Sequence, residues 1–149
     1  MQMAYRVVLV IAVSLLLAGT LAAGEKKLMH CFAFTVIDTA SQADWDAFFK
    51  ASDELPTKIP GLSRVWYGKL RSPMSVFNPD AESRKKLVAG AASATGDVKR
   101  VVRQWGMCME MDSEAALKAY AAHPAHKDWE AAYGKVRQPG TTTFDVLGQ

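Results

Sequence analysis

The sequence predicts one α+β domain, in which strands and helices follow in the order strand, helix, strand, insertion, strand, helix, helix, strand. Three observations carry this prediction. Apolar runs at residues 28–37, 62–70, 101–111 and 141–147 have the length and the aromatic and β-branched content of strands. Residues 41–55 repeat apolar side chains at helical spacing, and residues 112–133 are rich in alanine on both sides of one proline.

The N-terminal segment, residues 1–24, has the charge and hydropathy order of a secretory signal. Arg6 precedes an apolar run over residues 7–17, and small residues follow up to Gly24. We expect this segment to be removed and the protein to be exported, to the periplasm or the extracellular space. A helix that spans a membrane needs about 20 apolar residues, and this run is shorter. We therefore expect no stable membrane span after cleavage. Residues 25–149 then form a single domain.

Charge and cysteine content limit the partners and the compartment. The formal net charge of the 149 residues is only +3, which predicts no nucleic-acid partner.

The two cysteines, Cys31 and Cys108, are able to form a disulfide in an oxidising compartment. The alternative is a pair of buried free thiols that act as small apolar side chains. Their spacing in the sequence leaves both alternatives open.

The first strand and helix have clear local signals. Residues 28–37 are apolar on both faces, which favours a central strand, and their alternation places His30 and Phe32 on the same face. Ser41 with Asp44 three residues later is typical of a capping box that begins the helix 41–55. An Ile-Pro-Gly turn at residues 59–61 then leads to the second strand.

Residues 71–100 differ in composition from the rest and are expected to form an insertion or a mobile loop. Prolines at positions 73 and 79, a basic triplet and a small-residue tract at 89–96 interrupt the strand pattern. Asp80 is suited to cap a short helix that runs through Val88. The tract after that helix has too little apolar bulk to pack.

The strand pattern resumes at residues 101–111, where Trp105 and Met107 share a face. The helix that follows should end near Ala122, because Pro124 lacks an amide hydrogen and pushes His123 out of helical geometry. A second helix then starts at Pro124, and residues 141–147 form the last strand. These elements describe a ferredoxin-like α+β domain, β-α-β-β-α-β, with an antiparallel four-stranded sheet.

The corner from Tyr120 to His126 is the most informative segment, since it holds two of the three histidines. In an unbroken helix Tyr120 and His126 would point about 240° apart, but a bend at His123 can aim both into one cavity. A phenol and an imidazole that face a small molecule can exchange protons with it near neutral pH. The structural alternatives are a helix cap for His123, a bond to backbone for His126 and a satisfied buried phenol for Tyr120.

With these residues the chain resembles the stress-responsive α/β-barrel (Dabb) domain of the dimeric α+β barrel superfamily. The matching features are the first-strand His30, the Ile-Pro-Gly turn before a strand with Gly68, the Tyr-x-x-His-Pro-x-His segment and a closing Phe-Asp strand. The resemblance covers residues 28–70 and 101–148. It implies a homodimer whose two sheets face each other to form a barrel, with helices outside and a pocket between each sheet and its helices.

The resemblance also implies roles for single residues. One plant enzyme of the family closes a polyketide by aldol condensation with a tyrosine and a histidine as its acid–base pair, and these match Tyr120 and His126. Its first-strand histidine matches His30. The chain departs from this pattern at Trp105, which stands where that enzyme has a further pocket histidine.

Three functional hypotheses remain open. The first is an exported protein that binds a small apolar or aromatic molecule, with contacts from Phe32, Trp105, Met107 and His123. The second is a cofactor-free lyase or cyclase, in which His126 removes a proton beside a carbonyl and Tyr120 stabilises the enolate, with His30 as a further catalytic candidate. The third is a structural stress-response dimer without a ligand. None needs a cofactor, and the dispersed histidines predict no metal site.

Overall fold

The computed structural model describes residues 26–148, so the predicted export signal at residues 1–24 lies outside the described residues. Four strands form one sheet in the order β2-β3-β1-β4, and every neighbouring pair is antiparallel. This confirms the predicted ferredoxin-like α+β fold. The elements are, in chain order, β1 (Leu28–Val36), α1 (Gln42–Lys58), β2 (Leu62–Pro79), α2 (Ala81–Val88), β3 (Val98–Met111), α3 (Glu114–Ala122), α4 (Pro124–Val136) and β4 (Arg137–Leu147).

Local signals place the ends of several elements. The capping box at the start of α1 is present, because Asp44 N donates to Ser41 Oγ at 3.2 Å and Ser41 N donates to Asp44 Oδ2 at 3.1 Å. The helical corner also lies where the proline predicts it, with α3 ending at Ala122 and α4 beginning at Pro124. The last strand begins earlier than predicted, at Arg137, since it follows α4 without a loop.

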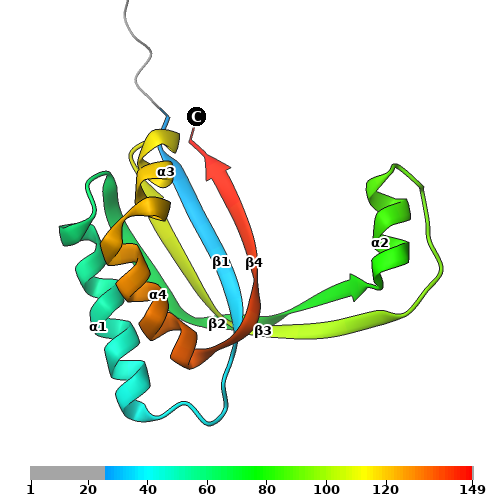
Figure 1. Cartoon of the computed structure of the whole chain (residues 1–149), viewed down its shortest axis with the longest axis horizontal. Helices are drawn as coiled ribbons and strands as arrows, with labels where there is room; N and C mark the ends of the chain where they lie inside the picture. The colour runs from blue at the N-terminus through cyan, green and yellow to red at the C-terminus, as the bar shows by residue number, and fades with distance from the viewer. Residues whose placement is uncertain (1–25, 149) are drawn as a thin grey trace, which may run out of the picture.

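The molecule has two layers, and only one face of the sheet is covered. Helices α1, α3 and α4 pack on one face, and the other face is open (Figure 1). The core between the layers includes Phe34, Phe48 and Met109, all fully buried. The open face instead presents Trp66, Phe144 and Val146, which are 64%, 53% and 54% exposed. This arrangement follows from the alternation of strand side chains, which sends successive residues to opposite faces.

A disulfide joins Cys31 of β1 to Cys108 of β3. The strand register places the two residues directly opposite each other, with their Cα atoms 4.2 Å apart. This distance is short enough for a bridge between neighbouring strands. The structure therefore decides between the two alternatives that the sequence leaves open.

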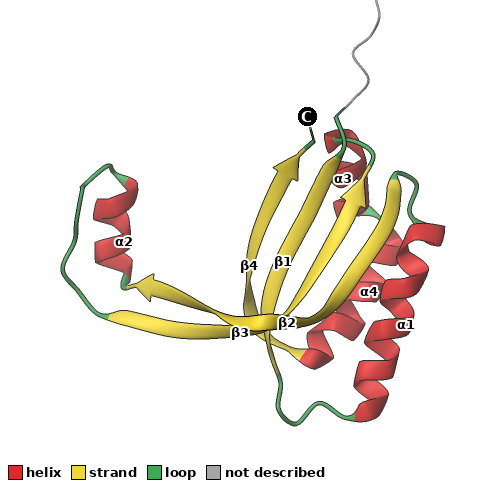
Figure 2. Ribbon diagram, turned by 180° about the vertical axis from the view of Figure 1, so that it is seen from behind, coloured by secondary structure: helices red, strands yellow, loops and turns green. Residues whose placement is uncertain are grey.

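Residues 71–100, expected as an insertion or loop, are largely regular structure, and we call them the arm. β2 and β3 continue beyond the sheet as a two-stranded ribbon, in which residues from Met74 to Pro79 pair with β3. A register shift between Lys69 and Met74 marks a bulge, and a bulge bends a strand. The ribbon leaves the sheet on the side away from the helices and carries α2 at its tip (Figures 1 and 2).

The prolines in this segment do not end the strand, and this explains the difference from the sequence-based expectation. Pro73 lies within the bulge and Pro79 is the last residue of β2, and both are places where a strand tolerates the missing amide donor. The predicted short helix is present, because the Asp80 side chain accepts from Ser83 N at 2.8 Å and begins α2.

Candidate functional site

A cavity of about 400 Å³ lies between the β1–β4 half of the sheet and helices α3 and α4. Its lining combines aromatic rings with polar side chains that converge from both layers. Phe32 and Trp129 supply apolar surface, with their ring centroids 6.0 Å apart. The main polar lining residues are His30, Tyr120, His126, Glu130, Tyr133 and Arg137.

The corner at His123 brings Tyr120 and His126 together, as the sequence predicts. Their ring centroids lie 4.2 Å apart. His123 itself takes the structural role, because its Nδ1 accepts from Ala125 N at 3.1 Å and caps α4. His123 does not line the cavity, so its expected contact with a ligand has no geometric support.

His126 is arranged as a neutral proton acceptor. Its Nδ1 lies 3.3 Å from the Ala121 carbonyl oxygen, and its Nε2 lies 3.9 Å from a carboxylate oxygen of Glu130. Burial lowers the pKa of His126, and the negative charge of Glu130 opposes part of that change. A neutral ring that donates Nδ1–H to Ala121 leaves Nε2 free to accept a proton.

Tyr120 complements this acceptor as a donor. Its side chain is buried, and burial raises the pKa of Tyr120, with the nearby charge of Glu130 acting in the same direction. The phenol therefore keeps its proton throughout the neutral range. A neutral phenol beside a neutral imidazole provides one hydrogen-bond donor and one base within the same cavity.

A second polar pair lies on the sheet side of the cavity. His30 Nδ1 and Asp145 Oδ1 are 2.6 Å apart, and the two residues are directly opposite in the β1–β4 register. Such a bond orients the imidazole and leaves its Nε2 for another partner. Sequence reasoning assigned no function to Asp145. The signal that would have found it is topological, since a closing strand beside β1 brings Asp145 next to His30.

Tyr133 and Arg137 carry polar atoms without a partner. The Tyr133 hydroxyl and Arg137 Nε are buried, and neither has a hydrogen-bond partner among the described residues. The Arg137 guanidinium lies over the Tyr133 ring, 4.6 Å from its centroid. Burial raises the pKa of Tyr133, so its hydroxyl stays a donor. The sequence shows no sign of this pair, because its significance depends on burial.

Two residues predicted to contact a ligand lie outside this cavity. Met107 is 1% exposed and belongs to the core. Trp105 packs on Trp45, with ring centroids 4.6 Å apart, and lines a different cavity of about 410 Å³. Alternation correctly placed both on the helix-covered face. Both belong to β3, however, and the first cavity lies over β1 and β4. Phe32, in contrast, does line the first cavity.

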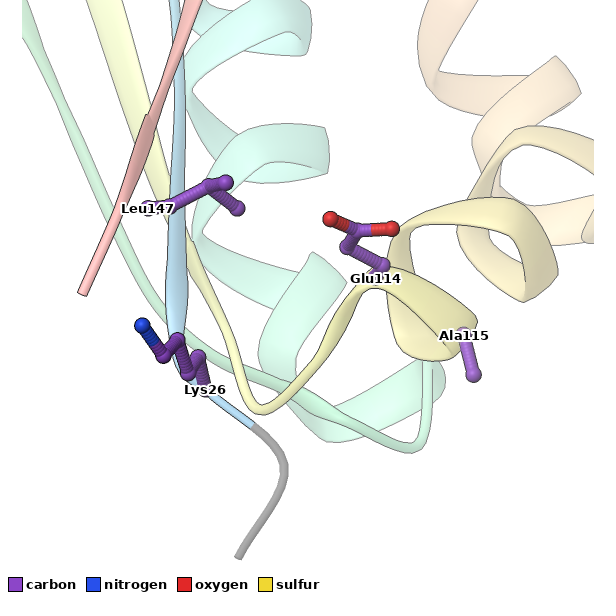
Figure 3. Close-up of a pocket in the computed structure, with 4 residues that line it drawn as sticks. All are labelled: Lys26, Glu114, Ala115 and Leu147. Carbon is purple, nitrogen blue, oxygen red and sulfur yellow. The ribbon is translucent and has the colours of Figure 1, made fainter. Parts of the chain in front are cut away.

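Another cavity, of about 280 Å³, lies where α3 begins beside the ends of β1 and β4. Figure 3 shows the Glu114 carboxylate directed toward Leu147, with Lys26 on the strand side. Its lining residues within 26–148 include no histidine and no tyrosine, so they provide no acid–base pair for neutral pH. Over residues 26–148, no group of three His, Cys, Asp or Glu side chains is placed to hold a metal ion.

Fold and site together define a class of protein: a ferredoxin-like α+β domain with a polar and aromatic cavity between its sheet and helices. No protein-family model and no curated protein sequence matches the chain. Solved structures do match it. A Dabb family protein from Mesorhizobium loti is 13% identical and aligns over 84% of this chain and 99% of its own, with a TM-score of 0.53.

Two further structures have the same fold. A dimeric ferredoxin-like protein of unknown function from Thermobifida fusca is 17% identical, with 83% and 92% of the two chains covered and a TM-score of 0.53. The hydroxynitrile lyase from Passiflora edulis is 10% identical, with 83% and 94% covered and a TM-score of 0.56. Likeness at these identities shows that the chain shares the ferredoxin-like fold of these proteins. Within the part of the chain that the structure describes, no helix is both long enough and apolar enough to cross a membrane.

Proposed function

We propose that the protein binds a small aromatic or apolar molecule with an acidic or carbonyl oxygen in the cavity between β1, β4, α3 and α4. The observation that carries this proposal is the pair of buried polar atoms, Tyr133 Oη and Arg137 Nε, that lack partners among the described residues. A buried polar group without a partner costs about 1–3 kcal/mol. A ligand oxygen that accepts from either group would recover part of that cost, while Phe32 and Trp129 contact its apolar part.

The proposal includes a homodimer formed through the open face of the sheet. Trp66, Phe144 and Val146 expose apolar surface there, and large exposed patches of this kind are typical of interfaces. The Thermobifida protein of the same fold is described as dimeric. Export to an oxidising compartment also remains a proposal, which the Cys31–Cys108 disulfide supports.

A second candidate function is a cofactor-free lyase or cyclase, which the Tyr120–His126 pair favours. In this reaction His126 Nε2 accepts a proton from the carbon beside a carbonyl, and the electron pair moves onto the carbonyl oxygen. The Tyr120 phenol donates to that oxygen as its negative charge develops. His30, whose Nδ1 is held by Asp145, presents its Nε2 as a further acceptor on the opposite wall. The Passiflora protein of the same fold is described as a hydroxynitrile lyase, which supports a lyase reaction as the alternative.

Native mass spectrometry of the mature protein from its own host tests the binding proposal. The expected species is a dimer that carries a small molecule, which Arg137→Met loses. Lys135→Met is the matched control, because Lys135 is exposed on the same stretch of chain and should keep the molecule. A wild-type dimer without any bound molecule would contradict binding and favour the structural stress-response dimer.

The same sample separates binding from catalysis. The mass of the bound molecule identifies its chemical class, and turnover is then measured on that class. If the protein is an enzyme, Tyr120→Phe should lower kcat far more than it weakens binding, since the phenol acts on charge that develops in the transition state. Equal losses in both would contradict the catalytic role.

A further inference from the structure

The arm presents apolar surface that its own protomer does not cover. Phe77 and Val98 are 63% and 57% exposed, and Val88 of α2 is 83% exposed. Pro79 pairs with Val98, and Phe77 lies two residues before Pro79, so Phe77 and Val98 share one face of the ribbon. Single exposed apolar residues are ordinary, but these are grouped on one projecting segment.

The tip of the arm has a defined internal structure. Ser83 Oγ lies 2.9 Å from the Asp80 carboxylate and 3.2 Å from the Thr95 carbonyl oxygen. Asp80 N donates to the Asp97 carbonyl oxygen at 2.9 Å. Gly96 packs so closely on Asp80 and Ser83 that a side chain there would collide with both. The arm is therefore built to hold a shape, although α2 makes no substantial contact with another helix or strand of the described chain.

The direction and length of the arm fit a second sheet. The arm leaves the body on the side of the open face, so the open face and the arm form two sides of a corner (Figures 1 and 2). The paired segment from Met74 to Pro79 spans about 20 Å at about 3.3 Å per residue. A sheet packed on the open face would lie about 10 Å away. The arm is long enough to pass that sheet and reach the helices behind it.

The charges of the arm also fit those helices. The arm has six basic and three acidic side chains, whereas the rest of residues 26–148 has 11 of each. Helix α1 has the largest acidic excess of the described helices, since it contains Asp44, Asp46, Asp53 and Glu54 against Lys50 and Lys58. A basic arm beside an acidic helix is complementary.

We infer that the arm is a clamp that holds a second copy of this chain. Phe77 and Val98 pack against the flank of the partner's sheet, and α2 reaches the partner's helical layer near α1. Two-fold symmetry makes the contact reciprocal, so that each dimer has two clamps. The inference rests on the proposed homodimer, and it adds an interface that the open face alone does not provide.

The variant Phe77→Thr/Val88→Thr removes apolar surface at two exposed positions, keeps a β-branched side chain at position 88 and places a residue with strand propensity at position 77. Ala91→Thr/Ala92→Thr is the matched control, because it changes two exposed residues of the same arm outside the apolar group. Sedimentation equilibrium of the mature chain should show at least a tenfold weaker dimer for the first variant and an unchanged dimer for the control. A dimer constant that is the same in both variants would overturn the clamp.

Cross-linking between light and 15N-labelled protomers gives a second readout. Amine cross-links between the arm lysines Lys85, Lys86 and Lys99 and the α1 lysines Lys50 and Lys58 should join a light chain to a heavy chain. Arm cross-links within one chain only would contradict the inference. So would arm-dependent binding to vesicles of phosphatidylglycerol and phosphatidylcholine together with an unchanged dimer constant.

A third variant distinguishes failure of the clamp from failure of the proposed homodimer. Trp66→Arg on the open face tests the sheet interface, because it leaves the arm unchanged. If wild type and the arm variant are equally dimeric while Trp66→Arg is monomeric, the clamp fails and the homodimer holds. If wild type is a monomer at micromolar concentration, both fail.

Discussion

His30 and Asp145 face each other across β1 and β4, with His30 Nδ1 and Asp145 Oδ1 2.6 Å apart. The contact joins the first strand of the domain to the last and directs an imidazole toward the Tyr120 side, where the two ring centroids are 6.3 Å apart. One wall of the cavity thus depends on a pair of residues from opposite ends of the chain.

Asp145→Asn should change the His30 ring more than the stability of the fold. The Asp145 side chain is 43% exposed, so loss of the pair should lower the free energy of unfolding by less than about 1 kcal/mol. Without the carboxylate, the proton on Nδ1 loses its best acceptor, and the two neutral tautomers should mix. Nitrogen chemical shifts of the His30 ring measure this directly. A single unchanged tautomer in the variant would contradict the orienting role of Asp145.

His126 should give the unfolding free energy a pH dependence below neutrality. Because the folded pKa is lowered from the ordinary 6.5, the unfolded state binds more protons in the window just below that value. Stability relative to His126→Asn should therefore rise as the pH increases through this window and level off above it. Urea unfolding from pH 5 to pH 8 measures the difference. A difference that falls with rising pH would mean that the charged form is the favoured one.

Tyr133→Phe should leave the ligand-free protein equally stable or more stable, by up to about 1 kcal/mol, because the hydroxyl that it removes is buried without a partner among the described residues. The same variant should bind the cavity ligand less tightly. Tyr67→Phe is the control, since Tyr67 donates to Asp53 at 2.7 Å and its loss should cost about 1 kcal/mol. Thermal unfolding of both, after removal of bound molecules, compares them. Equal destabilisation would show that the Tyr133 hydroxyl has a partner in solution.

Ser52→Ala should destabilise the fold by about 1–3 kcal/mol. Trp129 Nε1 donates to Ser52 Oγ at 2.9 Å, and both residues are buried, so the variant leaves an indole N–H unpaired. Trp129 also forms part of the cavity lining, and retention of the ligand should fall as well. Ser93→Ala, at an exposed serine of the arm, is the comparison that should change stability by less than about 0.5 kcal/mol. Similar denaturation midpoints for the two variants would contradict the structural role of Ser52.

Removal of the disulfide should cost about 2–4 kcal/mol, because it frees a loop with a sequence separation of 77 residues in the unfolded chain. The variant Cys31→Ala/Cys108→Ala keeps small apolar side chains at both positions. Its urea midpoint should match that of the wild type in dithiothreitol and lie below that of the oxidised wild type. An oxidised protein with the midpoint of the reduced one would show that the bridge adds no stability.

The features of this protein that are set by residues close together in the sequence were predictable. The capping box at Ser41 and the break at Pro124 involve interactions within a few positions, and both lie where the sequence places them. The arm was not predictable in this way. Its strands pair through contacts between residues far apart in the chain, and the bulge that accepts Pro73 exists only once β2 and β3 are aligned.

The sequence by itself determined the order of the elements, the face of the sheet that each strand residue occupies and the bend that joins Tyr120 to His126. Only the tertiary structure decided that Cys31 bonds to Cys108 and that Asp145 holds His30. It also decided that the Tyr133 hydroxyl and Arg137 Nε are buried beside the first cavity, whereas Trp105 lines a different one. Periodicity assigns a side chain to a face within its own element. Which residues of that face share a cavity depends on how helices from distant parts of the chain cover it, and no local pattern records that packing.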